Sequence, residues 1–311
     1  MPAFKLISDF DGVWTNQDEE AAFVQEYILK QISNISGFRG EKVSEIISGC
    51  RKEMDRTPYE WGWMNNGSIA CYYGEDPFGD NNAILDFIDR SANEKSFSIF
   101  KQELYVIKKS ILSNGFASLD SFSNKCFFDS TKKFKELGKL TPGKNIKKIV
   151  GELIKQGIET VVASNSKTEK IEYLFIKAGV PVSTEKSIKR SDVHARGGSI
   201  KFVIDNDYDS LPEFIEVTKR FKPNLRRKNY FKVLSEEKPD FVIGDVFSLD
   251  LALPLYLRMN DKNFSNLKVI QKVHKHTPTW VKDFLSKYVE EGIAGMIDEV
   301  DELPDAIRKL K

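Results

Sequence analysis

The chain has 311 residues, of which 41% are hydrophobic and 30% are charged, and its 47 basic and 46 acidic residues give a net charge of +1. This length suggests about two domains with a large buried core. The nearly balanced charge provides no general attraction to nucleic acid or to an anionic membrane surface, so we expect neither as a partner. No apolar run reaches the ~18 residues of a transmembrane helix, and the first residues do not form a basic, apolar signal segment. We therefore expect a cytoplasmic protein.

Residues 5–8 form a short, mainly apolar run that predicts a buried strand. Asp9 and Asp11 follow directly, and Gly12 then turns the chain. Because side chains alternate along a strand, the two carboxylates leave on the same side, and Gly12 lets the backbone approach a ligand closely. These residues are suited to a metal ion and a phosphoryl group, although an ordinary acidic turn has the same composition.

In residues 16–140, apolar residues recur every three or four positions, which predicts amphipathic helices. We see no comparable alternation of apolar and polar residues of the kind that predicts strands, so we expect an all-helical insertion. A segment at residues 59–78 is dense in aromatic, glycine and asparagine residues, including Trp61 and Trp63. These rings either pack between helices or line a substrate pocket.

From residue 141 onward, helical and strand patterns alternate. Residues 158–163 form an apolar strand that ends at Ser164 and Asn165, with a helix on either side. This order is typical of a parallel sheet, in which ligands bind at the carboxyl ends of the strands. Ser164 and Asn165 are therefore candidate ligand contacts, and capping of the following helix is the alternative.

Residues 197–205 and 214–217 predict two further strands, whose role the sequence leaves open. A basic run at residues 221–228 begins the next helix, where cations oppose the helix dipole and are best matched by an anionic partner. A buried strand then ends at Asp245, and Asp250 follows five positions later.

Residues 267–270 and 295–297 predict the last two strands, each followed by a helix that completes the core. His274 and His276 lie after the first of them. They are a possible metal pair, but no third ligand is evident nearby, and surface histidines are the alternative.

Three groups of polar residues thus follow three predicted strands, and their order resembles the haloacid dehalogenase superfamily. The first motif of that family, Asp-x-Asp-Gly, is similar to residues 9–12, and the second, a Ser or Thr that ends a strand, is similar to Ser164. The fourth, Gly-Asp with a further Asp, is similar to Gly244-Asp245 and Asp250.

The resemblance covers residues 1–15 and 141–311. It implies an α/β fold with a Rossmann-like parallel sheet, and it implies that residues 16–140 form an inserted helical cap domain. It also implies Mg²⁺ as the cofactor.

The family's chemistry implies roles for the acidic residues. Asp9 would attack phosphorus and form an aspartyl phosphate, and Asp11 would protonate the leaving alkoxide and later activate water. Asp9, Asp245 and the backbone carbonyl of Asp11 would bind magnesium, a hard ion that prefers oxygen ligands. Asp250 would fix a metal-bound water or the lysine of the third motif.

Gly12, Ser164, Asn165 and that lysine would surround the phosphoryl group, where electrostatic stabilisation contributes most. The lysine is not uniquely placed. Lys228 best fits the pattern of the following helix and is our choice.

Two alternatives to Lys228 remain. Lys222 precedes a proline, as is common in the family, and Arg227 is another basic candidate. In addition, Val13 replaces the Thr that is usual after Asp-Gly, so one polar contact near the site is missing.

The resemblance therefore predicts a magnesium-dependent phosphatase that hydrolyses a small soluble phosphomonoester. A phosphomutase with the same core chemistry and a catalytically silent binding module are the alternatives. The substrate and the oligomeric state are left open.

Overall fold

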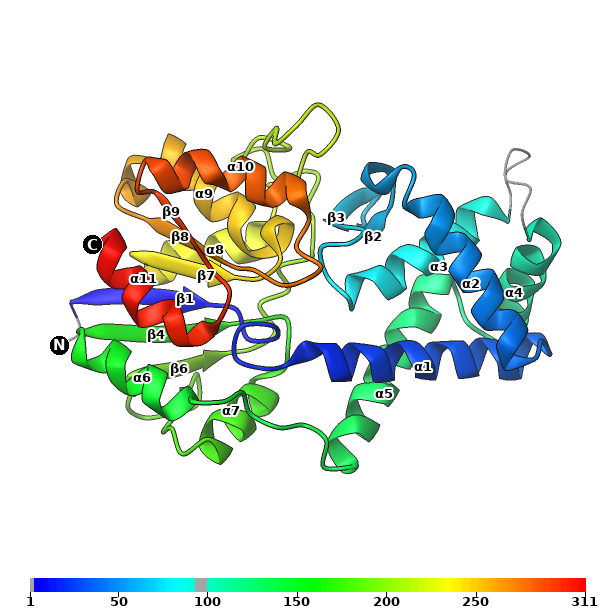
Figure 1. Cartoon of the computed structure of the whole chain (residues 1–311), viewed down its shortest axis with the longest axis horizontal. Coiled ribbons are helices and arrows are strands. Elements are labelled where there is room, and N and C mark those ends of the chain that lie inside the picture. The colour runs from blue at the N-terminus through cyan, green and yellow to red at the C-terminus, as the bar shows by residue number, and fades with distance from the viewer. Residues whose placement is uncertain (1–2, 93–99) are drawn as a thin grey trace. The chain divides into compact units, whose positions relative to one another are not determined.

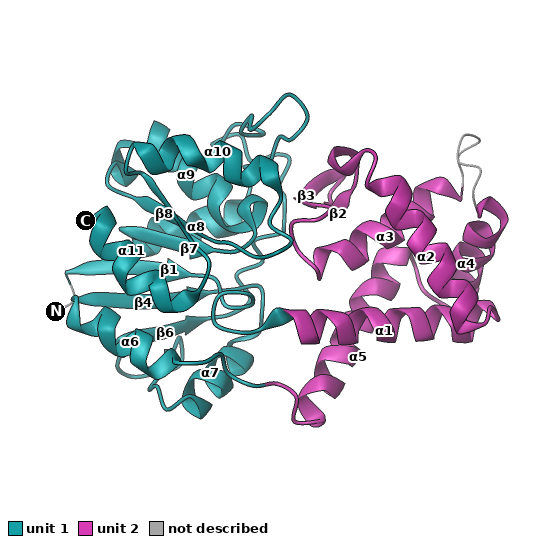
Figure 2. Cartoon of the chain, in the orientation of Figure 1, with its two compact units in different colours: residues 1–17, 141–311 teal, residues 18–140 magenta. Residues whose placement is uncertain are grey.

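The computed structural model describes residues 3–92 and 100–311, which divide into two compact units (Figure 2). The core unit contains residues 1–17 and 141–311, and the inserted unit contains residues 18–140. Each unit has its own cluster of buried apolar side chains.

The core unit is built on a seven-stranded sheet in which every neighbouring pair of strands is parallel. In order across the sheet, the strands are β5 (Ser183–Thr184), β6 (Val193–Arg196), β4 (Ile158–Ala163), β1 (Phe4–Ser8), β7 (Phe241–Gly244), β8 (Lys268–Lys272) and β9 (Ala294–Ile297). Both neighbours of β1 are parallel to it, so the carboxyl ends of β4, β1 and β7 meet at one edge. The predicted Rossmann-like parallel sheet is confirmed.

Helices pack against this sheet on both faces (Figure 1). They are α6 (Ile146–Lys155), α7 (Thr168–Lys177), α8 (Lys228–Glu237), α9 (Ala252–Asn260), α10 (Thr279–Glu290) and α11 (Leu303–Leu310). One buried cluster joins α8, α9 and α10 to β1, β7 and β8. The strands read as nearly continuous apolar runs because a parallel sheet is covered on both faces.

The described residues of the inserted unit form five α-helices, a short 3-10 helix (Pro58–Glu60) and a β-hairpin. The helices are α1 (Gln17–Ser36), α2 (Gly40–Met54), α3 (Gly79–Ser91), α4 (Lys101–Ser113) and α5 (Leu119–Glu136), of which α1 starts on the last residue of the core unit. The hairpin pairs β2 (Gly62–Asn65) with β3 (Ser68–Tyr72).

The expectation that this insertion is all-helical is therefore wrong. Asn66 and Gly67 both have positive φ, 49° and 78°, as a two-residue hairpin turn requires. The Asn-Gly pair was the signal for this turn. Its flanking residues do not alternate cleanly between apolar and polar, so the strands on either side were not recognised.

Some aromatic residues of the hairpin region are buried, and others are partly exposed. Trp61 is buried, and its ring centroid lies 4.7 Å from that of Phe87. The guanidinium of Arg90 lies 3.8 Å from the ring centroid of Trp61. Trp63 and Tyr73 are half-buried. For Trp61, packing within the unit is thus the supported interpretation.

The strand predictions for residues 197–205 and 214–217 are also wrong. Strand β6 ends at Arg196. Within residues 197–227, all of which the structure describes, the only β-pairing is an isolated bridge between Phe214 and Asn224. Gly198 and Ile200 have positive φ, 63° and 41°, so the backbone turns instead of extending. This irregular segment brings Lys201 into the protein interior.

Within the described part of the chain, no helix combines the length and the apolar character that a membrane-spanning segment requires.

Glu237, the last residue of α8, binds three cations. Its carboxylate lies 3.0 Å from Lys5 Nζ, 2.8 Å from the Arg190 guanidinium and 3.0 Å from that of Arg196. Burial alone would raise the pKa of Glu237, but the hydrogen bonds and charges of Arg190 and Lys5 outweigh it and lower the pKa to about 2.

We expect Glu237→Gln to lower the free energy of unfolding by about 2 kcal/mol at neutral pH. A carboxylate with a lowered pKa stabilises the fold above its unfolded-state pKa, near 4.5, and this contribution is lost as the pH falls toward 2. Urea unfolding at pH 7 and at about pH 3 should therefore show a difference between variant and wild type that shrinks in acid. Glu236→Gln, which removes a more exposed carboxylate bound to Arg196, is the matched control and should change stability less. An equal loss at both pH values would contradict this account of Glu237.

Candidate active site

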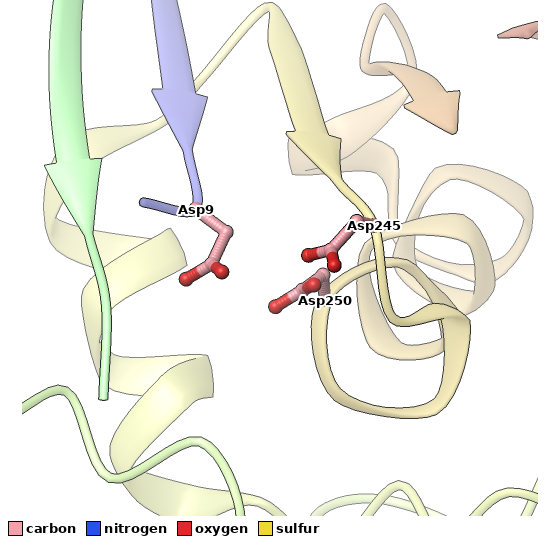
Figure 3. Close-up of side chains that lie close together, drawn as sticks. All are labelled: Asp9, Asp245 and Asp250. Carbon is pink, nitrogen blue, oxygen red and sulfur yellow. The ribbon is translucent and has the colours of Figure 1, made fainter. Parts of the chain in front are cut away.

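The ends of two neighbouring strands bring carboxylates together. Asp9 follows β1 and Asp245 follows β7, and the Asp9 N–H donates to the Ile243 carbonyl at 2.9 Å, which extends the pairing of the two strands by one residue. Asp250 lies in a short π-helical turn, Phe247–Leu251, immediately after β7. Figure 3 shows the three carboxylates at this edge, and one oxygen of each lies within 4.8 Å of the others.

A buried lysine contacts two of these carboxylates. Lys201 Nζ lies 2.6 Å from Asp9 Oδ1 and also donates to Asp250 Oδ1. Asp250 Oδ2 accepts a hydrogen bond from the Val246 N–H at 3.1 Å, so both oxygens of Asp250 are bound. Lys201 is therefore fixed between Asp9 and a carboxylate that is itself held by the backbone.

Burial and charge act in opposite directions on these groups. Burial raises the pKa of Asp9 to about 7, although the ammonium of Lys201 opposes the shift. Burial would lower the pKa of Lys201, but the carboxylates of Asp250 and Asp9 outweigh it and hold that pKa above its usual range. The lysine therefore remains a cation.

Side chains from two other segments hold the backbone of Lys201, and a third holds that of Asp250. The Lys201 N–H donates to Asn165 Oδ1 at 2.7 Å, and its carbonyl accepts a hydrogen bond from the buried guanidinium of Arg227 at 2.5 Å. The hydroxyl of Tyr230 donates to the Asp250 carbonyl at 2.9 Å. The lysine thus lies on irregular backbone that is fixed on both sides.

Asp11 points to a different set of partners. Ser166 Oγ donates to its Oδ2 at 2.5 Å, and Lys170 Nζ lies 2.9 Å from its Oδ1. Both partners come from the start of α7 and the turn before it. The two aspartates of the first motif therefore each have their own lysine.

Gly12 lies against Asp245 in a conformation that favours glycine, with φ of +77°. A Cβ atom at this position would lie 2.1 Å from Asp245 Oδ2, which also accepts a hydrogen bond from Gln17 Nε2 at 2.7 Å. His274 Nε2 is 2.9 Å from the Gly12 carbonyl, and its ring stacks on that of His276 with centroids 5.0 Å apart. His274 thus braces the Gly12 turn.

Most of the residues predicted for the site lie at this edge. Asp9, Asp245 and Asp250 cluster, and Ser164 follows β4 beside them, where its buried Oγ accepts a hydrogen bond from the Ser166 N–H at 3.2 Å. Asn165, predicted to bind substrate, holds the backbone of Lys201.

The choice of Lys228 requires correction, because the lysine against Asp9 is Lys201. Lys228 Nζ lies 5.9 Å from the ring centroid of Tyr208, and Lys222 forms an ion pair with Glu216 at 3.5 Å. Twenty-six irregular residues, 202–227, separate Lys201 from α8, so spacing relative to that helix was misleading.

Sequence reasoning also missed Ser166, Lys170 and Gln17. The signal for Lys201 was a single cation inside an apolar run, Ile200 to Ile204, which is unusual unless the cation is paired. The other three residues occupy ordinary polar positions at the starts of helices, and the sequence contains no comparable signal for them.

We expect Gly12→Ala to lower the free energy of unfolding by roughly 3 kcal/mol, since the methyl group must displace Asp245 in addition to adopting positive φ. Gly157 also has positive φ, +73°, but a Cβ atom there meets its nearest neighbours at an ordinary 3.7 Å. Gly157→Ala should therefore cost only about 1 kcal/mol. Urea unfolding of both variants measures the difference, and equal losses would show that Gly12 is not packed against Asp245.

No protein-family model matches the sequence, and a search of curated proteins finds no significant match. Solved structures match over nearly the whole chain. A structure assigned as a β-phosphoglucomutase from Thermotoga maritima is 12% identical with a TM-score of 0.44, covering 99% of this chain and 100% of that chain. One assigned as a phosphoglycolate phosphatase from Lactobacillus delbrueckii subsp. bulgaricus is 14% identical with a TM-score of 0.44, covering 99% of both chains. The HAD-hydrolase YfnB from Bacillus subtilis, bound to magnesium, is 11% identical with a TM-score of 0.41, covering 98% of both chains.

The parallel sheet places β1 between β4 and β7, and the predicted polar residues follow the ends of these three strands. The chain thus has an α/β fold with a Rossmann-like parallel sheet, and its polar residues follow the strands at which the resemblance to the haloacid dehalogenase superfamily places them.

Proposed function

We propose that the protein is a magnesium-dependent phosphatase that hydrolyses a small phosphomonoester through an aspartyl phosphate on Asp9. The observation that carries this proposal is the buried contact of Lys201 with Asp9, beside the carboxylates of Asp245 and Asp250. A carboxylate with a fixed cation next to it is suited to attack an anionic phosphate, which would otherwise repel it.

The donor set fits a hard divalent cation. Three carboxylates within 4.8 Å of one another offer oxygen ligands, which magnesium prefers, and they carry more negative charge than Lys201 neutralises. Asp9, Asp245 and the backbone carbonyl of Asp11 would hold the ion, whereas Asp250 is occupied by Lys201 and the Val246 N–H. Magnesium would withdraw charge from the phosphoryl oxygens and favour the ionised form of Asp9.

Each residue at the site then has its own role in the reaction. Asp9 attacks phosphorus, and Asp11 gives a proton to the leaving oxygen and later takes one from the attacking water. Lys201 stabilises the equatorial oxygens, and Ser164 can donate its hydroxyl hydrogen to one of them. Asn165 acts through Lys201, whose backbone it holds.

We also propose that the inserted unit is a cap that selects the substrate. It begins six residues after Gly12 and ends before the helix that leads into β4, so it interrupts the chain between the first and second motifs. A cap in this position can exclude water and contribute binding energy remote from the reacting atoms.

We expect Asp9→Asn to fold normally and to lose at least about a thousandfold in turnover, because an amide cannot form the covalent intermediate. The assay is phosphate release from a panel of phosphorylated metabolites with magnesium. Asp305→Asn, at an exposed aspartate paired with Arg308, is the control and should retain full activity. If Asp9→Asn kept a tenth of wild-type turnover, Asp9 would not be the nucleophile.

Lys201→Met should lower turnover about a hundredfold, as the loss of other preorganised electrostatic contacts does. Lys228→Met should leave it nearly unchanged, because that side chain lies near Tyr208. Thermal unfolding of both variants checks that each is folded at the assay temperature. The opposite order of effects would indicate that Lys228, and not Lys201, stabilises the phosphoryl oxygens.

A further inference from the structure

The start of α7 holds both carboxylate oxygens of Asp11. Ser166 Oγ donates to Oδ2 at 2.5 Å, and Lys170 Nζ lies 2.9 Å from Oδ1. The side chains of Lys170 and Asp11 are each only 18% exposed. This contact connects the turn after β1 to the helix after β4, and it is separate from the contacts that Lys201 makes.

The position of Lys170 is unfavourable unless the contact with Asp11 offsets it. Lys170 is the third residue of α7, and a cation in the first turn of a helix opposes the helix dipole. It is also largely removed from water, which costs a charged group free energy. An exposed position on the same helix would avoid both costs, as that of Lys177 does.

Building on the proposed function, we propose that Lys170 and Ser166 are positioning residues that orient Asp11 toward the leaving group. In the first step, the bond from Asp9 to phosphorus forms, the bond from phosphorus to the leaving oxygen breaks, and the proton of Asp11 moves to that oxygen. Asp11 is then a carboxylate, and Lys170 and Ser166 keep it in place for its second task. Lys201 contacts Asp9, so each aspartate has its own lysine.

The test compares two matched esters, 4-nitrophenyl phosphate and 4-nitrobenzyl phosphate. The first releases a stable phenolate that needs little protonation, whereas the second releases an alkoxide that needs a proton. Because general acid catalysis contributes roughly 10²–10⁴-fold, Lys170→Met should lower kcat/KM at least about tenfold more for the benzyl ester than for the phenyl ester. Ser166→Ala should shift the same ratio in the same direction.

Several controls separate positioning from a structural role. Lys177→Met, at the other end of α7, should leave the ratio unchanged. In an Asp11→Asn background, Lys170→Met should change the ratio less than about twofold, because residues that act through one group are not additive. Thermal unfolding shows that each variant is folded.

Two results would overturn the inference while leaving the phosphatase proposal intact. One is that Lys170→Met lowers kcat/KM equally for the two esters, and the other is that it changes the ratio as much in the Asp11→Asn background as in the wild type. If wild-type protein with magnesium hydrolysed neither these esters nor any phosphorylated metabolite in the panel, the proposed function would fail, and this inference with it.

Discussion

The buried contact between Lys201 and the carboxylates of Asp9 and Asp250 is the interaction on which the site depends. Removing charged groups from water is costly, and the cost is recovered only when the groups pair with good geometry. Here one ammonium contacts two of three clustered carboxylates, so the site keeps an excess of negative charge. Such an excess suits a site that binds a divalent cation, whereas it would be unfavourable in a purely structural core.

The parallel sheet explains how distant parts of the sequence form this site. Because β1 lies between β4 and β7, residues that follow these strands meet at one edge although they lie far apart in the sequence. The segments between the strands supply support. Asn165 and Arg227 hold the backbone of Lys201, and Gln17 binds Asp245 from the first residue of α1. Asp9 and Asp245 therefore lie directly after strands of the sheet, and the residues that hold Lys201 and Asp245 come from loops and helix starts.

Sequence reasoning was most successful where a local pattern determines the structure. Asp9 and Asp245 were predicted because a buried strand followed by acidic residues is readable from a few neighbouring positions. Lys201 could not be placed in this way, since irregular backbone carries it and its partners are Asp9 and Asp250, 192 and 49 positions away. The hairpin turn at Asn66 and Gly67 was readable in principle. Its strands were not, because residues around Trp63 lack a regular alternation of apolar and polar side chains.

The most direct test of the central claim does not require the substrate. Beryllium trifluoride binds carboxylates that accept a phosphoryl group and mimics an aspartyl phosphate, and fluorine NMR detects the bound form. The account predicts bound fluorine signals that appear only with magnesium and that disappear in Asp9→Asn. Absence of bound signals in the wild-type protein with magnesium, or signals that persist in Asp9→Asn, would contradict a phosphoryl-transfer site built on Asp9.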